Sequence, residues 1–245
     1  MQKIFQAIFT VYSLLIFSIL MLILGPFILI PVLLSDKAGT ISFFFIRVWA
    51  RTWSFLSGFR FEIHGREKID LQKPYIYIFN HSSFFDAPII PVAIPQQVRA
   101  LGKKELKNIP VFGFLISRLT VWVDRENPES RKESLAKLVQ ILEKGISIVV
   151  SPEGTRNDSD KILLPFHKGV FRLSIETGIP IYPIAIIGAA QIHQRGSYLL
   201  SPGKVRIYFL NPIDPPDSQS QELEAFIQKC RIELETFIEE KMPID

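Results

Sequence analysis

A histidine and an aspartate five positions apart, His81 and Asp86, are the side chains of this sequence best suited to acid–base chemistry. On a straight helix, five residues advance by about 500°, which would point the two side chains about 140° apart. In a turn, the Asp86 carboxylate can instead fold back onto the imidazole. A carboxylate hydrogen-bonded to one ring nitrogen fixes the tautomer and raises the basicity of the other nitrogen. The spacing therefore indicates a histidine that can take a proton from a hydroxyl group.

The pair belongs to a polar turn, NHSSFFD at 80–86, that lies between two apolar runs. The run at 75–79 predicts a strand, and the run at 87–94 predicts a helix. Pro88 fits the first turn of that helix, because the amide lost there would be unpaired anyway. The pattern indicates a strand that ends at a pocket, followed by a turn that carries the chemistry.

The residues alone leave other interpretations open. Asp86 could be only the N-cap of the following helix, and His81 could be a turn histidine without a chemical role. A hydrolase with Ser82 or Ser83 as nucleophile is disfavoured, because neither serine lies in a Gly-x-Ser-x-Gly elbow. Cys230 is the single cysteine, which excludes an intrachain disulfide, and its place in a C-terminal helical pattern predicts a packing residue.

Further along the chain, three other stretches combine turn residues, charge and strand-like runs. They are GKKEL at 102–106 with IPVFG at 109–113, SPEGTR at 151–156, and IPIYPI at 179–184. The first and second of them directly follow apolar runs that predict strands, so their charged residues are expected at strand ends.

Together with the turn at 80–86, these stretches resemble the motifs of the glycerolipid acyltransferases, specifically the 1-acylglycerol-3-phosphate O-acyltransferases. They occur in the family's order and at family-like spacing. The resemblance implies transfer of a fatty acyl group from a thioester, on acyl carrier protein or coenzyme A, to the 2-hydroxyl of lysophosphatidic acid, which yields phosphatidic acid. It implies His81 as general base, Asp86 as the group that orients it, and no metal or other cofactor. The stretch at 179–184 is expected to shape the pocket.

The resemblance also implies a site for the substrate phosphate. It assigns a phosphate-binding lysine to Lys103, with Lys104 as the alternative. Arg156 offers a forked hydrogen-bond donor to a phosphate at neutral pH. Asp124 and Arg125 close another predicted strand and resemble a family feature whose role the sequence leaves open.

The residues next to Arg156 in the stretch at 151–156 are expected to form a loop. Gly154 permits a tight backbone path, and Glu153 is expected either to help bind the acceptor or, with Thr155, to hold the loop. One departure from the family pattern follows in LPFHKG, where His167 occupies the usual lysine position and Lys168 comes next. The charge of that position is therefore displaced by one residue or dependent on pH. These residues precede a predicted helix, whose N-terminus suits an anion.

Other functions remain alternatives at this stage. The acceptor could be another lyso-lipid, such as a lyso-ornithine lipid, or glycerol 3-phosphate. The protein could also be a non-catalytic lipid-binding protein on one membrane leaflet, with a phosphate pocket. Binding requires only the basic residues, whereas catalysis also requires His81 and Asp86 within hydrogen-bond reach of each other.

Composition limits the class of protein. With 245 residues, 48% of them hydrophobic, the chain can form one sizeable core, and we expect one domain with an appendage. The net charge of +4 suits anionic lipid head groups and phosphorylated substrates. Binding of nucleic acid is not indicated, because no dense block of Lys and Arg with interleaved aromatic residues occurs.

The N-terminal segment predicts membrane association. No residue from 4 to 34 is charged, and as a helix this run would be about 46 Å long, against about 30 Å for the hydrocarbon core. Gly25, Pro26 and Pro31 predict a kink or break near residue 25. The run is too long for the apolar region of a signal peptide, so we expect it to stay attached.

The segment at 40–59 predicts a second N-terminal helix. Arg47 and Arg51 lie on a narrow polar stripe, and aromatic residues fill the rest of its surface, which is typical of a helix at a membrane interface. The alternative is a buried core helix with two arginines that reach solvent. We therefore expect residues 1–59 to form a two-helix membrane anchor, monotopic or single-span, on the cytoplasmic face of a membrane, and residues 60–245 to form the catalytic domain.

Short apolar runs alternate with helical periodicity in the remainder of the chain. The predicted strands are 59–63, 75–79, 98–101, 120–123, 147–150, 181–187 and 205–210, and the predicted helices are 87–94, 111–118, 128–144, 168–177 and 221–241. This alternation predicts an α/β fold with a mostly parallel central sheet covered by helices. In such folds ligands bind at the carboxyl ends of the strands.

Overall fold

The computed structural model describes residues 2–35, 38–108, 112–193, 196–217 and 222–242. Within these residues, seven strands form one sheet in the order β1-β7-β6-β2-β5-β3-β4. The strands are β1 (Arg60–His64), β2 (Ile76–Phe79), β3 (Val98–Lys103), β4 (Thr120–Val123), β5 (Ser147–Val150), β6 (Ile181–Ile187) and β7 (Lys204–Phe209). Neighbouring strands are parallel except β6 and β7, which are antiparallel. The predicted α/β fold with a mostly parallel sheet is confirmed.

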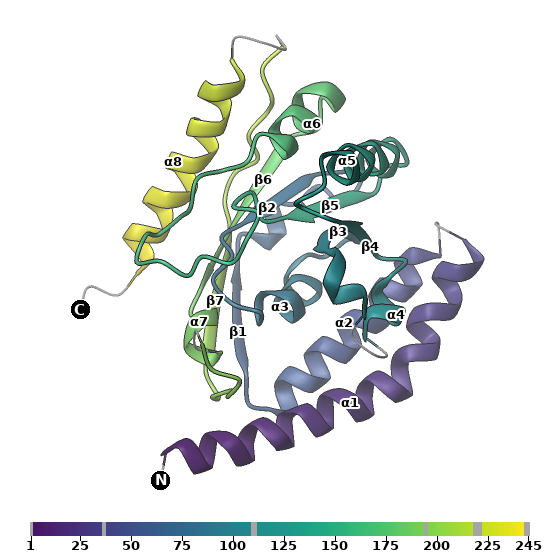
Figure 1. Cartoon of the computed structure of the whole chain (residues 1–245), viewed down its shortest axis with the longest axis vertical. Helices are drawn as coiled ribbons and strands as arrows, with labels where there is room; N and C mark the ends of the chain where they lie inside the picture. Colours follow the sequence, from purple (N-terminus) through teal and green to yellow (C-terminus); the bar gives the residue numbers. More distant parts are fainter. Residues whose placement is uncertain (1, 36–37, 109–111, 194–195, 218–221, 243–245) are drawn as a thin grey trace.

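Helices cover both faces of this sheet (Figure 1). They are α1 (Gln2–Leu34), α2 (Gly39–Leu56), α3 (Asp86–Ala93), α4 (Phe112–Ile116), α5 (Pro128–Glu143), α6 (Gly169–Thr177), α7 (Ala189–Ile192) and α8 (Leu223–Lys241). One core cluster packs α2 and α3 against the sheet, and a second packs α5, α6 and α8 against its other face. Each strand, and each helix predicted after residue 60, is found within two residues of its predicted bounds.

The burial of the central strands explains why the sequence predicts them. All residues of β2, β5 and β6 are buried, so these strands appear in the sequence as continuous apolar runs. Because β2, β5, β3 and β4 are parallel neighbours, their carboxyl ends meet at one edge of the sheet. The predicted site residues at these strand ends are thereby gathered at that edge.

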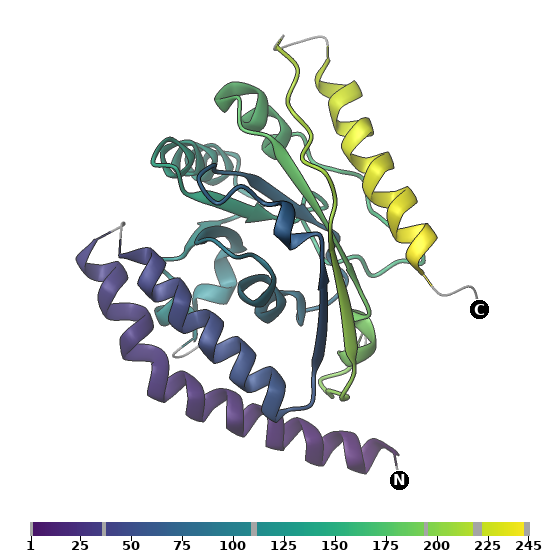
Figure 2. The same ribbon diagram turned by 180° about the vertical axis from the view of Figure 1, so that it is seen from behind.

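Helix α1 runs from Gln2 to Leu34 without a break and contains Pro26 and Pro31. Its ribbon bends in its later part in both views (Figures 1 and 2), as expected where proline removes a helical hydrogen bond. A break at residue 25 is therefore not found. The contact with α2 includes a hydrogen bond between the hydroxyls of Ser13 and Ser57, 3.0 Å apart, and the Trp53 indole donates to the Ser13 carbonyl at 3.0 Å.

Helix α2 packs one side into the core and leaves the other side exposed, where Phe44 and Phe55 are 55% and 81% exposed. Phe43, Trp49 and Trp53 are buried in the core clusters. The Arg47 guanidinium donates to the carbonyl oxygens of Pro91, at 3.2 Å, and Ile94, at 3.1 Å, at the end of α3. This arginine therefore stabilises the C-terminus of a neighbouring helix rather than facing lipid head groups. The membrane contact expected of α2 stays a prediction.

Helix α1 carries most of the exposed apolar surface. Its outward positions include Ile4, Ile8, Val11, Leu15 and Leu22, each with half or more of its surface exposed. By length and composition α1 could cross a membrane, and 22% of its most apolar window is buried. Such a surface is unusual for a soluble monomer and is typical of a membrane contact.

Candidate active site

The turn at 80–86 is fixed at its first residue. Asn80 follows β2, and its side-chain amide donates to the Ile186 carbonyl at 2.9 Å and accepts from the Ile186 amide at 2.7 Å. Asn80 is 8% exposed, so neither interaction competes with much water. This two-way bond to β6 holds the start of the turn at the carboxyl edge of the sheet.

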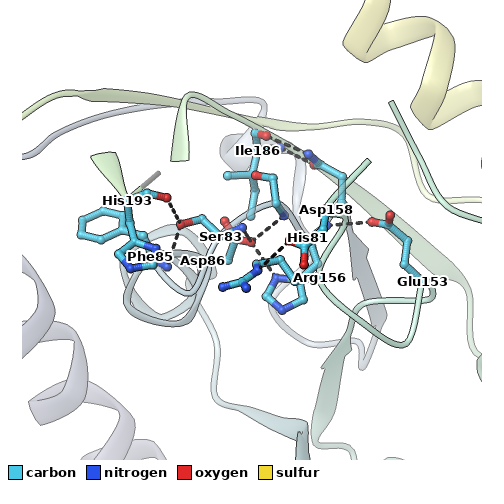
Figure 3. Close-up of polar contacts among 11 residues, drawn as sticks. His81, Ser83, Phe85, Asp86, Glu153, Arg156, Asp158, Ile186 and His193 are labelled. Atoms are coloured by element: carbon cyan, nitrogen blue, oxygen red, sulfur yellow. Dashed lines mark hydrogen bonds and ion pairs between the residues drawn. The ribbon is translucent and has the colours of Figure 1, made fainter. Parts of the chain in front are cut away.

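His81 and Asp86 meet as their spacing predicted. His81 Nδ1 lies 2.7 Å from Asp86 Oδ2, and the same oxygen accepts from the amides of Ser82, at 3.1 Å, and Ser83, at 3.0 Å (Figure 3). Because the carboxylate accepts a hydrogen bond from Nδ1–H, the lone pair remains on Nε2. Among the described residues no hydrogen bond involves Nε2, and a quarter of the His81 side chain is exposed. The imidazole is therefore oriented to accept a proton from outside.

Asp86 is more than a helix cap. It is the first residue of α3, and its carboxylate bonds back to the turn rather than forward to the amides of the helix. Burial raises the pKa of this carboxyl above its ordinary value, and the bonds from His81, Ser83 and Ser82 oppose that effect. A buried acceptor surrounded by three donors is rigid, which holds the imidazole at one angle.

Glu153 ties the second loop of the site to the first. Its Oε1 accepts from the His81 amide at 2.8 Å, and its Oε2 accepts from the Leu164 amide at 2.9 Å. The residue is 2% exposed, and burial raises the pKa of its carboxyl. Since both oxygens bond to backbone amides, the geometry favours loop support over acceptor binding for Glu153. Asn157 adds a bond from its amide to the His81 carbonyl at 2.7 Å.

Arg156 lies over the turn that holds His81. Its Nε donates to Asp158 Oδ1 at 3.1 Å, and its guanidinium carbon lies 4.3 Å from the centre of the Phe84 ring. This cation–π contact fixes the guanidinium while its terminal nitrogens stay available to a ligand. Phe84 is one of the residues that sequence reasoning missed as a site residue.

His193 is a second residue near the site that the sequence does not indicate. It follows the short helix α7, its carbonyl accepts from the Ser83 hydroxyl at 3.3 Å, and its ring packs edge-on to Phe84 at 5.9 Å. Burial, together with the nearby Arg156 charge, lowers the pKa of His193. No motif surrounds this histidine in the sequence, so only the fold brings it to the site.

The predicted phosphate-binding lysines lie on the other side of β5. Lys103 ends β3 and its ammonium lies 3.4 Å from Glu105 Oε1, while the Lys104 ammonium lies 3.7 Å from Asp124 Oδ2. Both side chains are more than half exposed. Within the described residues no contact joins either lysine to Arg156. Residues 109–111 of the IPVFG stretch lie outside the described residues.

Gly154 and the residues near it form the outer part of the loop. Gly154 has φ of +68°, and a Cβ there would lie 2.4 Å from Cδ2 of His167, so only glycine fits. The His167 amide donates to the Pro152 carbonyl at 2.8 Å. Thr155 is exposed. The Lys168 ammonium forms an ion pair with Glu224 at 2.7 Å.

Comparison with known proteins places this geometry in a family. Residues 60–187 match the sequence family described as Acyltransferase. The chain belongs to the acyltransferase family. The match contains the His81–Asp86 turn and the Glu153–Arg156 loop, so the acyltransferase motifs and the described site coincide.

Individual acyltransferases agree with this assignment. The chain is 32% identical over 207 residues to the 1-acyl-sn-glycerol-3-phosphate acyltransferase BAT2 of Brassica napus. This match covers 82% of this chain and 58% of that relative. It is 23% identical to the human 1-acyl-sn-glycerol-3-phosphate acyltransferase beta, over 77% of this chain and 68% of the human one. The chain spans between 50% and 61% of the lengths of the five plant relatives compared.

A solved structure matches this chain over nearly its full length. The 1-acyl-sn-glycerophosphate acyltransferase PlsC from Thermotoga maritima superposes with a TM-score of 0.83 at 26% identity. The match covers 98% of this chain and 97% of that one, so it includes α1 and α2 as well as the sheet.

The Ser83 hydroxyl and the Cys230 thiol are not placed as nucleophiles in this protein. The Ser83 hydroxyl is fully buried and is used within the turn, where it donates to His193 and accepts from the Phe85 amide. Cys230 is buried in the core between α8 and the sheet, and burial raises its pKa to about 12. A thiol with that pKa is protonated at neutral pH and is a poor nucleophile.

Proposed function

We propose that this protein transfers a fatty acyl group from a thioester, carried by acyl carrier protein or coenzyme A, to the 2-hydroxyl of lysophosphatidic acid. The product would be phosphatidic acid. The observation that carries the proposal is the His81–Asp86 pair, whose Nε2 is free to accept a proton at the carboxyl edge of the sheet. The family and the printed names of the relatives support the choice of reaction and acceptor.

The chemistry follows from the charge that each group can carry. His81 Nε2 takes the proton of the acceptor hydroxyl as its oxygen attacks the thioester carbonyl, and the Asp86 carboxylate stabilises the imidazolium that forms. The tetrahedral intermediate then expels the thiolate, which recovers the proton from the imidazolium. A thioester is already activated, so orientation and a base are sufficient and no acyl-enzyme is required.

A panel of substrates tests this proposal. Purified protein is incubated with acyl-coenzyme A or acyl carrier protein thioester and with lysophosphatidic acid, lyso-ornithine lipid or glycerol 3-phosphate, and the lipid products are measured by mass. We expect phosphatidic acid to form fastest. A faster product from either other acceptor would replace lysophosphatidic acid in the proposal. No product from any combination would favour the non-catalytic lipid-binding alternative.

We further propose that Arg156 and Lys103 bind the phosphate of the acceptor, with Lys104 as the alternative to Lys103. Arg156→Ala removes a guanidinium that Asp158 and Phe84 hold over the turn. Charge-assisted hydrogen bonds of this kind are worth roughly tenfold or more in binding. We expect kcat/KM to fall at least tenfold more for lysophosphatidic acid than for a neutral lyso-acceptor.

The control for Arg156 is Arg172→Ala, which changes an exposed arginine of α6. This variant should keep both activities. Equal losses of Arg156→Ala on charged and neutral acceptors would instead assign Arg156 a structural role.

We propose that α1 lies in one leaflet of the membrane, with the active site at the bilayer surface on the cytoplasmic side. The exposed apolar surface of α1 supports membrane contact. Two hydrogen bonds join the N-terminal part of α1 to the α/β domain. The side-chain amide of Gln6 donates to the Ser201 hydroxyl at 2.8 Å, and the backbone amide of Leu200 donates to the Thr10 hydroxyl at 2.8 Å. A helix bound along the domain in this way supports an embedded anchor over a perpendicular span.

Accessibility labelling distinguishes these arrangements. Lys3→Cys and Lys137→Cys place thiols near the N-terminus and on the exposed side of α5, each in a Cys230→Ala background. We expect a membrane-impermeant maleimide to reach both thiols from the same side of sealed vesicles. Labelling of Lys3→Cys only from the opposite side would show that α1 spans the bilayer.

A further inference from the structure

Two features that the sequence left without a role meet at one pocket. Arg125 follows β4, and His167 and Lys168 directly precede α6. All three line a pocket of about 320 Å³ that also receives Arg131 from α5. This volume lies at the small end of ligand-binding pockets. The pocket is separate from the His81 side of the loop, and the proposed reaction has so far not used it.

The lining of this pocket suits an anion with an apolar part. Its floor includes Leu101, Val123 and Leu138, and it contains no acidic residue. In the described part of the chain neither Arg125 nor Arg131 forms an ion pair, whereas Lys168 is paired with Glu224. Both arginines are exposed to solvent at the pocket. Packing around Arg125 lowers its pKa, and the charge of Glu105 opposes that effect. Two unpaired guanidinium groups over apolar walls indicate a ligand that carries a phosphate.

The pocket adjoins the active site through a single loop. Pro152 and Gly154 line it, while the residue between them, Glu153, bonds to the His81 amide on the other side. Arg156 is directed to that other side, where it contacts Phe84. The loop therefore has a cationic site on each of its two sides. A reaction between two phosphate-bearing substrates needs a cationic site for each of them.

We propose that this pocket binds the phosphopantetheine arm of the thioester donor. The inference rests on the proposed acyl transfer and adds the site of its second substrate. The arm is shared by coenzyme A and acyl carrier protein. It carries a phosphate ester next to a geminal dimethyl group, followed by amides and the sulfur that bears the acyl chain. Arg125 and Arg131 bind the phosphate, and the apolar floor receives the dimethyl group.

Direct binding tests the proposal without turnover. Titration calorimetry on the full-length protein in detergent compares 4′-phosphopantetheine with pantetheine, which lacks the phosphate. We expect the phosphorylated compound to bind roughly tenfold or more tightly, and Arg125→Gln/Arg131→Gln to remove that difference. Lys137→Gln, on the exposed side of α5, is the matched control and should retain it. Equal binding of both compounds by the unchanged protein, or an unchanged difference in the double variant, would overturn the proposal.

Kinetics then separate donor from acceptor. In Arg125→Gln/Arg131→Gln we expect KM to rise roughly tenfold or more for each donor that the enzyme uses, acyl-coenzyme A or acyl carrier protein thioester. The KM for lysophosphatidic acid should stay within twofold. A rise in the acceptor KM alone would assign the pocket to the acceptor and overturn the proposal. If none of the acceptors were acylated, the proposed function would fail, and the calorimetric comparison would still decide whether the pocket binds the arm.

Discussion

His81→Ala should lower kcat for acyl transfer by about 10²- to 10⁴-fold, the usual contribution of a general base. The substitution removes the imidazole and leaves the backbone bonds of residue 81 to Glu153 and Asn157 in place. The turn should therefore keep its path, and the loss should appear in the chemical step. Asp86 loses one of its three donors and, because its pKa is already raised by burial, can take up a proton instead of remaining a buried charge.

The measurement is the rate of phosphatidic acid formation at saturating substrate, together with thermal unfolding followed by circular dichroism. His64→Ala is the matched control, because His64 stacks on Tyr208 at the far edge of the sheet. It should keep near-normal activity. If His81→Ala retained more than about a tenth of kcat, His81 would not be the general base.

Asp86→Asn should give the second largest loss, about 10²-fold or more yet smaller than that of His81→Ala. The asparagine amide is nearly the same size, so the fold should tolerate it. It carries no charge to stabilise an imidazolium, and one of its two orientations presents an NH₂ group to the amides of Ser82 and Ser83. The imidazole would remain, but in a mixture of tautomers and angles.

The effect of Asp86→Asn is measured as kcat over a range of pH. Asp70→Asn is its control because the Asp70 carboxylate is exposed, where it pairs with Lys73 and accepts from the Gln72 amide. We expect the control to be unaffected. An Asp86→Asn enzyme with normal kcat would mean that orientation of His81 does not depend on the charge of Asp86.

The strands and the turn could be predicted because their signals are local. Buried strands such as β2 and β5 are continuous apolar runs, and the turn between β2 and α3 is marked by polar residues and by the spacing of His81 and Asp86. The short helix α7 carries no comparable signal, and it was not predicted.

The contacts that complete the site could not be predicted, since they join distant parts of the chain. Asn80 bonds to Ile186, 106 residues away, and His193 reaches Ser83 across 110 residues. For the same reason the sequence could not say that Arg47 would bond to the end of α3. A polar stripe on a helix indicates that something polar lies beside it, and only the fold shows whether that is lipid or protein.

Direct transfer is the central claim, and intact-mass measurement after mixing the enzyme with thioester donor alone tests it. The site supplies an oriented base, and the Ser83 hydroxyl and the Cys230 thiol are both buried, so we predict an unmodified protein mass. Ser82→Ala and Cys230→Ala should then stay active. A stoichiometric acyl adduct that disappears on addition of lysophosphatidic acid would contradict the account and direct attention to the serines beside His81.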